Sequence, residues 1–362
     1  MIRRALIPLF VVVALVLSAP AITQSRFAEV ERLAAEALKE MGAPGMSVAI
    51  ALGNQLVWSQ GFGLADAEHE VPARANTVYR IASISKPIAA TAVMQLAERG
   101  RVSIDDPVQK YVRAFPPKGE QVVTIRHLLT HTSGIRHYRG REMESRERYE
   151  TVEEALAIFK DDPLLFAPGT KYSYSTYGYN ILAGVVESAS GLGFETYLRT
   201  HVWTPAGMTS TYFDHGSAII PRRARQYIRD IGILLNAPYA DLSNKWAGGG
   251  MLSTAEDLMR FHIALEEDKL LKPDTLRQMF APYRLSDGSN STYGLGWATW
   301  TNARGQFWIG HSGGATGGTT FLVRDPVRKV AVAVLCNVER ARGLGALAER
   351  IADEAAKRSK TN

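Results

Sequence analysis

The chain has 362 residues, of which 46% are hydrophobic and 22% charged, with a net charge of +6. This length allows one large domain or two interlocked ones, and the composition excludes disordered and fibrous proteins. The charge is mild and scattered, which argues against a nucleic-acid partner and is compatible with anionic substrates or cell-envelope polymers.

The N-terminus has the pattern of an export leader. A short basic start, MIRR, precedes the apolar run ALIPLFVVVALVLS, and the small residues Ala19 and Ala21 fit a signal peptidase site. We expect a signal peptide over residues 1–21 and a secreted or periplasmic protein. The run approaches the ~18 apolar residues of a membrane span, so an uncleaved membrane anchor is the alternative, and only that form would bind a membrane.

The next segments predict a helix, a strand pair and a second helix. RFAEVERLAAEALKEMG has helical periodicity and ends at Gly42, a typical helix C-cap. MSVAIALGNQLVWSQGFGLAD predicts two strands joined by a tight turn at Gly53 and Asn54. IASISKPIAATAVMQLAERG then predicts a helix that begins at about Ser83 and stops at Gly100.

The middle of the chain is predicted to be mostly helices and loops, and strand patterns return near the C-terminus. YGLGWATW, GQFWIGHSGG, GTTFLVRD and VAVAVLCN are strand-like, and LGALAERIADEAAKR is an amphipathic helix. The lone Cys336 is expected to be buried in the last strand. Strands at both ends predict an α+β domain at 27–358, with a sheet part at about 27–105 and 285–358 and a helical part at about 106–284.

Ser83 and Lys86 form an S-x-x-K motif at the head of the second predicted helix. The i, i+3 spacing puts both side chains on one helix face, whereas Ser85 would point away. A lysine with a lowered pKa can take the proton of a serine hydroxyl and make it a nucleophile. Pro87 fits a first helical turn, which places the hydroxyl at the positive end of the helix dipole. Alone, the motif is equally compatible with a capping serine and a solvated lysine.

Two distant segments offer partners for this pair. KYSYSTYGYNILAGVVE places Tyr174 and Thr176 in a polar turn before an apolar helix, and a phenol beside a lysine can relay protons. FWIGHSGGATGG places His311, Ser312 and several glycines at a strand end, where N–H groups are free to form an oxyanion hole. The structural alternatives are a packed aromatic loop and a strand exit with an incidental histidine.

These segments, in the order S-x-x-K, Y-x-[NST] and [KH]-[ST]-G, resemble the serine beta-lactamase and penicillin-binding-protein family. The resemblance runs from GAPGMSVAIA through HLLTHTSGIRHY and KWAGGGMLSTAEDLMRF to IGHSGGATGG. Within this family, the chain resembles the class C branch, of peptidase S12 type, and most of all the serine beta-lactamase-like proteins of animal mitochondria. It implies a beta-lactamase/transpeptidase-like fold, in which an antiparallel sheet built from both termini is flanked by helices and carries an inserted helical region.

The resemblance also implies a role for each candidate residue. Ser83 would be the acylated nucleophile and Lys86 its base or proton shuttle, and Tyr174 would protonate the leaving group or serve as the base. The backbone N–H groups of Ser83 and Gly314 would form the oxyanion hole. The residues implied to line the substrate site are Thr176, His311, Ser312 and Gly313.

Two positions depart from the family pattern. Thr176 replaces an asparagine that would bind a substrate amide, and His311 replaces a lysine that would bind a beta-lactam carboxylate. Because histidine has a reference pKa of ~6.5, it is mostly neutral at pH 7. We therefore expect an exported serine hydrolase that acts through an acyl-serine on peptide bonds, D-Ala-D-Ala type included, or ester bonds. A true beta-lactamase and a non-catalytic penicillin- or peptide-binding protein are the alternatives.

We expect no cofactor and no metal. His127 and His131 have the i, i+4 spacing of metal ligands, but no Glu or Cys signal accompanies them, and the resemblance indicates a helix ending at Gly134. Trp246 and the glycines 248–250 belong to a glycine-rich segment without the G-K-[ST] of a phosphate loop, and they are candidates to border the cleft.

Overall fold

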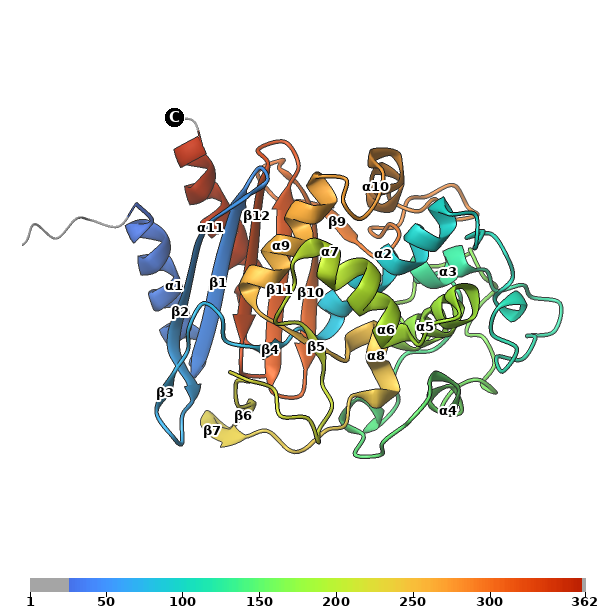
Figure 1. The fold of residues 1–362 in the computed structure, drawn as a ribbon, viewed down its shortest axis with the longest axis horizontal. Helices are drawn as coiled ribbons and strands as arrows, with labels where there is room; N and C mark the ends of the chain where they lie inside the picture. The colour runs from blue at the N-terminus through green and yellow to red at the C-terminus, as the bar shows by residue number, and fades with distance from the viewer. Residues whose placement is uncertain (1–25, 360–362) are drawn as a thin grey trace, which may run out of the picture.

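The computed structural model describes residues 26–359, so the predicted signal peptide at 1–21 lies outside the described residues. The centre of the fold is a seven-stranded antiparallel sheet of order β3-β2-β1-β12-β11-β10-β9 (Figure 1). Its N-terminal and C-terminal strands meet where β1 pairs with β12, and Val48 lies opposite Val334. This arrangement confirms the α+β fold and the sheet built from both ends of the chain.

The strands follow the predicted runs. The β1–β2 turn falls at Gly53 and Asn54, as expected. The sheet strands are β1 (Gly45–Leu52), β2 (Gln55–Asp66), β3 (Val71–Pro72), β9 (Ala298–Thr301), β10 (Phe307–Ala315), β11 (Gly318–Asp325) and β12 (Val330–Cys336). Two smaller sheets contain β4 (Tyr79–Arg80), β5 (Tyr212–Phe213) and β8 (Met251–Ser253), and β6 (Tyr227–Asp230) with β7 (Ile233–Asn236).

Helices cover both faces of the large sheet. Helices α1 (Ala28–Met41) and α11 (Leu344–Ser359) pack on one face, and α1 ends at Gly42 in the left-handed conformation, as predicted. The helices toward the other face are α2 (Ser85–Glu98), α3 (Ile125–Leu129), α4 (Val152–Leu156), α5 (Thr176–Ser190), α6 (Phe194–Leu198), α7 (Thr204–Ala206), α8 (Trp246–Gly249), α9 (Ala255–Glu266) and α10 (Pro273–Phe280) (Figure 1). Within residues 26–359, none of the helices is both long enough and apolar enough to cross a membrane.

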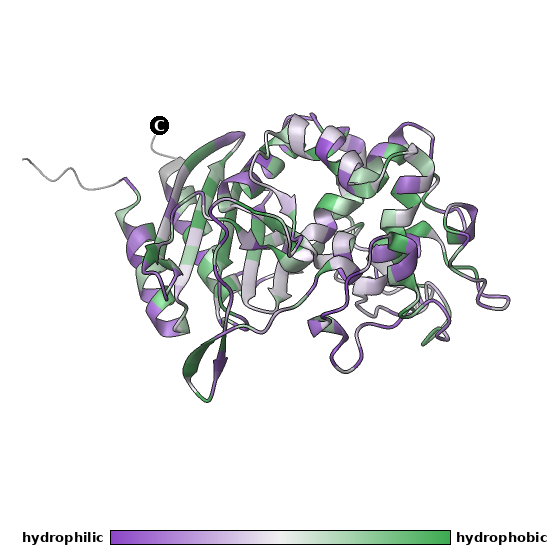
Figure 2. Cartoon of the chain, turned by 60° about the horizontal axis from the view of Figure 1, so that its bottom comes forward, coloured by the Kyte–Doolittle hydropathy of each residue, from purple (hydrophilic) through white to green (hydrophobic). Residues whose placement is uncertain are grey.

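Strand β12 is buried on both faces, which explains its unbroken apolar sequence. Val332 and Val334 pack with α1 and α11, whereas Ala331 and Ala333 belong to the core shared with α9. The small alanine side chains allow α9 to approach the sheet closely. Apolar residues accordingly concentrate along the strands (Figure 2). Cys336 is fully buried, as expected, and burial raises the pKa of its thiol to about 12.

Two helix boundaries differ from the sequence predictions. Residues Ala82–Ile84 form a short 3-10 turn, and α2 begins at Ser85 rather than Ser83. Helix α3 ends at Leu129, well before Gly134, because His131 adopts a left-handed conformation with φ 57° that stops the helix. Non-glycine residues rarely adopt this conformation, so the sequence pattern favours Gly134 as the cap.

Candidate active site

Ser83 and Lys86 lie together although they occupy different elements. Lys86 Nζ, on the first turn of α2, lies within hydrogen-bond distance of Ser83 Oγ in the 3-10 turn, at 3.1 Å. The tight turn therefore preserves the proximity that helical spacing predicted. Ser85 is fully buried, and its hydroxyl instead accepts the backbone N–H of Met251 at 3.3 Å.

Lys86 is fully buried and forms no ion pair among the described residues. Its Nζ also donates to Thr176 Oγ1 at 3.2 Å and to the carbonyl oxygen of Gly248 at 2.5 Å. Burial, reinforced by the charge of Lys245, holds the pKa of Lys86 well below its usual range. The neutral amine, which can accept a proton, is thereby favoured.

Tyr174 lies next to this lysine, directly before α5. Lys86 Nζ is 4.7 Å from the centre of the Tyr174 ring. Burial raises the pKa of Tyr174 above its usual range, and this effect outweighs hydrogen bonds from Ser83 and Thr176 that lower the pKa. The phenol is therefore protonated at neutral pH and is better suited to donate a proton than to remove one.

His311, on β10, is buried with both ring nitrogens occupied. Its Nδ1 lies 2.6 Å from the carbonyl oxygen of Ser312, and its Nε2 lies 2.7 Å from the hydroxyl oxygen of Tyr293. Because a carbonyl only accepts, Nδ1 carries the proton and Nε2 accepts from Tyr293. Burial, followed by the charge of Lys86, lowers the pKa of His311 to about 3. His311 is thus neutral and already hydrogen-bonded within the protein.

The glycines after His311 bring β10 against the Ser83 turn. A Cβ on Gly313 would lie 2.2 Å from Thr320 Oγ1 and 2.5 Å from the carbonyl oxygen of Ile81, so a larger residue would push the strand away. Gly314 is exposed, and a Cβ there would meet no atom within 4 Å. Ser312 is exposed as well, so open space lies beside this end of the strand.

Two histidines near Tyr174 were not predicted as site residues. The ring centres of His131 and His137 lie 4.2 Å and 5.5 Å from that of Tyr174. Burial lowers the pKa of His137 to about 4 and that of His131 well below its usual range. Both belong to HLLTHTSGIRHY, a segment that marked the family resemblance but carried no chemical motif.

The sequence spacing of His127 and His131 does not produce a metal site. His127 Nδ1 accepts the N–H of Thr124 at 3.2 Å and caps α3, whereas His131 lies beyond the end of that helix. Neither belongs to a group of three potential metal ligands in residues 26–359.

The glycine-rich segment after Lys245 borders the site in part. Gly248 contributes its carbonyl oxygen to Lys86, and a Cβ at Gly248 would lie 2.4 Å from Thr176 Cγ2. Trp246 instead packs against Phe213 and His215, with ring-centre distances of 5.0 and 4.9 Å. The Trp246 ring also lines a hollow with Phe213 and His215.

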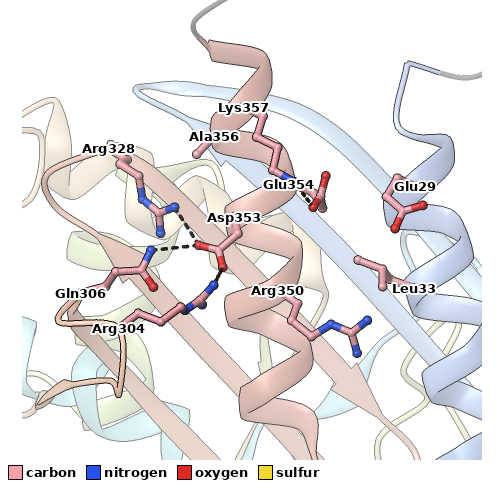
Figure 3. A pocket seen from close by; sticks show the side chains of 10 residues that line it. All are labelled: Glu29, Leu33, Arg304, Gln306, Arg328, Arg350, Asp353, Glu354, Ala356 and Lys357. Carbon is pink, nitrogen blue, oxygen red and sulfur yellow. Dashed lines mark hydrogen bonds and ion pairs between the residues drawn. The ribbon is translucent and has the colours of Figure 1, made fainter.

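A further hollow lies between α1 and α11, on the sheet face opposite α9 (Figure 3). Asp353 accepts hydrogen bonds there from Arg328 at 2.7 Å and Gln306 at 3.1 Å, and pairs with Arg304 at 2.5 Å. The lining of this hollow includes none of the residues Ser83, Lys86, Tyr174 and His311.

The sequence model of the family described as Beta-lactamase matches residues 30–357. The chain is 32% identical to the human mitochondrial serine beta-lactamase-like protein, over 87% of this chain and 77% of that protein. It is 29% identical to an esterase of Burkholderia gladioli, over 72% of this chain and 75% of the esterase. The octameric penicillin-binding protein homologue from Pyrococcus abyssi has a TM-score of 0.78 and 30% identity, over 90% of this chain and 76% of that one.

Proposed function

The chain belongs to the beta-lactamase family of serine hydrolases, and we propose that it cleaves ester or peptide bonds through an acyl intermediate on Ser83. The observation that carries this proposal is the 3.1 Å contact between Ser83 Oγ and Nζ of a buried Lys86 without a carboxylate partner. A neutral amine at that distance is a base within reach of the hydroxyl proton.

Acylation would proceed in two steps. The Ser83 oxygen forms a bond to the substrate carbonyl carbon while its proton passes to Lys86. The bond to the leaving group then breaks, and the leaving group takes the proton of the Tyr174 hydroxyl. Lys86 returns its proton to Tyr174, so both groups end as they began. Water then hydrolyses the acyl-serine, and Lys86 and Tyr174 act in reverse.

The backbone supports the negative charge that develops on the carbonyl oxygen. Antiparallel pairs alternate between hydrogen-bonded and open pairs, and Gly314 pairs with Thr319 one position before the β10–β11 turn. We infer that the Gly314 N–H points away from β11 and, with the N–H of Ser83, forms the oxyanion hole. Ser312 is exposed beside this position and would contact the substrate, whereas Thr176 is 2% exposed and its hydroxyl is hydrogen-bonded to Lys86.

The charge balance of the site favours substrates without a carboxylate beside the scissile bond. His311 is neutral and saturated with hydrogen bonds. Lys245 is only 4% exposed, and its Nζ donates to the carbonyl oxygen of Met143 at 2.5 Å. Neither residue presents an exposed cation to a beta-lactam carboxylate. Neutral esters and amides are therefore the preferred class, and one relative is an esterase by name.

Intact-mass labelling with a fluorophosphonate tests the nucleophile. The wild-type protein should gain one probe, Ser83→Ala should gain none, and the control Ser85→Ala should label like the wild type. Labelling of Ser83→Ala would contradict the assignment, and an unlabelled wild type would favour a non-catalytic binding protein. A panel of p-nitrophenyl esters, D-Ala-D-Ala peptides and nitrocefin tests the substrate class, and nitrocefin as the fastest substrate would contradict the argument from His311.

We also propose that the leader directs export and is removed near Ala21, from its basic start and apolar run. N-terminal sequencing of the protein recovered from its native host tests this. A start at residue 22 in a soluble envelope or secreted fraction supports cleavage, whereas an intact start in the membrane fraction indicates an anchor.

A further inference from the structure

His131 is the most unusual residue around Tyr174. It is 1% exposed and has φ 57°, in the left-handed region that non-glycine residues rarely adopt. Strained backbone of this kind persists only where the surrounding structure enforces it, and it concentrates at functional sites. The strained backbone of His131 therefore suggests that its contacts have a function.

His131 is bonded to both residues that flank Tyr174. Its carbonyl oxygen accepts the N–H of Ser173 at 2.8 Å, and its Nδ1 accepts the N–H of Ser175 at 3.1 Å. Its ring lies against the Tyr174 ring, with centres 4.2 Å apart. The left-handed conformation directs the carbonyl and the imidazole of one residue toward two peptide groups of the same loop.

Within residues 26–359, the buried imidazole of His131 has one unsatisfied N–H group, which costs free energy. Nδ1 accepts a backbone proton, so the proton of the neutral ring is on Nε2, which has no hydrogen-bond partner among the described residues. The rings of Tyr179 and Tyr293 enclose it, with centres 5.2 and 4.6 Å away. A leucine would fill much of this space without a buried unpaired N–H, but it could not accept the Ser175 N–H.

We propose that His131 is a positioning residue that fixes the Tyr174 hydroxyl for proton transfer to the leaving group. This inference rests on the proposed function, because it assigns Tyr174 the role of proton donor. His131 does not touch the reacting atoms. It acts by holding the peptide groups on either side of Tyr174, and so restricts the loop that carries the phenol.

The test compares two esters that share an acyl group, an alkyl ester and a p-nitrophenyl ester. Only the poor alkoxide leaving group needs a proton, so a misplaced Tyr174 lowers kcat/KM for the alkyl ester selectively. We expect His131→Leu to lower the ratio of the two kcat/KM values by about 10-fold to 100-fold, at or below the ~10²-fold lower limit for complete loss of a general acid, because Tyr174 is misplaced rather than removed. His131→Asn should retain most of the ratio, because asparagine tolerates the left-handed conformation and its Oδ1 can accept the Ser175 N–H.

Two further variants keep the test decisive. His131→Gly accepts the backbone conformation without the acceptor, so it should reproduce the lower ratio even if His131→Leu fails to fold. His127→Leu removes the same kind of Nδ1 bond at Thr124 and should leave the ratio unchanged. Equal losses for both esters, or an asparagine variant as impaired as the glycine variant, would overturn the inference. A wild type that no fluorophosphonate labels would refute the proposed function instead.

Discussion

The two faces of the large sheet differ in how an ionisable side chain is paired. Between α1 and α11, Asp353 is surrounded by hydrogen-bond donors from Arg328, Gln306 and Arg304 (Figure 3). On the other side of the sheet, Lys86 is more deeply buried, and its hydrogen-bond partners within residues 26–359 are neutral. A paired charge keeps its protonation state, whereas an unpaired buried amine is driven toward its neutral form. The comparison indicates that the first cluster contributes stability and the second is suited to proton transfer.

The histidines around Lys86 and Tyr174 extend this contrast. His131, His137 and His311 all have lowered pKa values, for each of which burial is the leading cause. Lys86 adds to the effect, since its charge disfavours a second cation nearby. Burial and the mutual repulsion of these groups therefore disfavour more than one positive charge in this cluster, so the three histidines remain neutral.

Replacing Lys86 should have the largest effect and separates the two faces most clearly. We expect Lys86→Met to slow fluorophosphonate labelling of Ser83 by about 10³-fold or more at neutral pH, because the base is lost. The same change should raise the free energy of unfolding at neutral pH, because it removes an amine whose protonation burial disfavours, by about 1.4 kcal/mol for each unit by which the pKa of Lys86 is lowered. Labelling kinetics and denaturant unfolding measure the two effects.

The gain in stability should depend on pH. The unfolded chain protonates Lys86 at its usual pKa of ~10.4, whereas the folded protein binds that proton less readily. Wild-type stability therefore rises with pH up to that value, and the advantage of Lys86→Met should shrink between pH 7 and pH 10. Normal labelling in the variant would move the base role to Tyr174, and a loss of stability would contradict the comparison of the two faces.

The sequence predicted which of Ser83, Lys86 and Tyr174 lie together better than it predicted what surrounds them. The S-x-x-K spacing identified Ser83 and Lys86 because three residues of either a 3-10 turn or an α-helix bring side chains to one side. Tyr174 was found because it precedes an evident apolar helix. His131 was misplaced in a helix, since a left-handed histidine leaves no local signal. Tyr293 was missed because its contact with His311 arises only when the loop before β9 packs against β10.

Acidification should lower the free energy of unfolding, because the folded protein keeps its buried histidines neutral. The effect should be of intermediate size. The pKa of His311 is lowered to about 3, so between that pH and ~6.5 the unfolded chain binds a proton that the folded protein does not. Stability should therefore fall on acidification by about 1.4 kcal/mol per pH unit from this residue alone. His311→Gln should remove that slope. Urea unfolding at several pH values measures it.

The comparison between His311→Gln and the wild type cancels the effect of carboxylates, which also titrate in acid. Asp353→Asn serves as the control, because it removes no histidine and should keep the slope between pH 6.5 and pH 5. A His311→Gln variant with the wild-type slope would show that this histidine is protonated in the folded protein, and would contradict the argument that the site lacks a free cation.

Removing the charge of Asp353 from its cluster with Arg328, Gln306 and Arg304 should have the smallest effect on stability. Burial alone would raise the pKa of Asp353, but hydrogen bonds from Arg328, Gln306 and Arg304 outweigh it and hold the pKa below its usual value. Asp353→Asn should lower the free energy of unfolding by about 1 kcal/mol, the upper range for ion pairs that retain some exposure. The difference from the wild type should be present above ~pH 4, vanish as pH falls through the folded pKa, and diminish in high salt. Fluorophosphonate labelling should be unchanged, because the sheet separates Asp353 from Ser83. Slower labelling in a stable Asp353→Asn protein would mean that the two faces are coupled and that the cluster around Asp353 also supports catalysis.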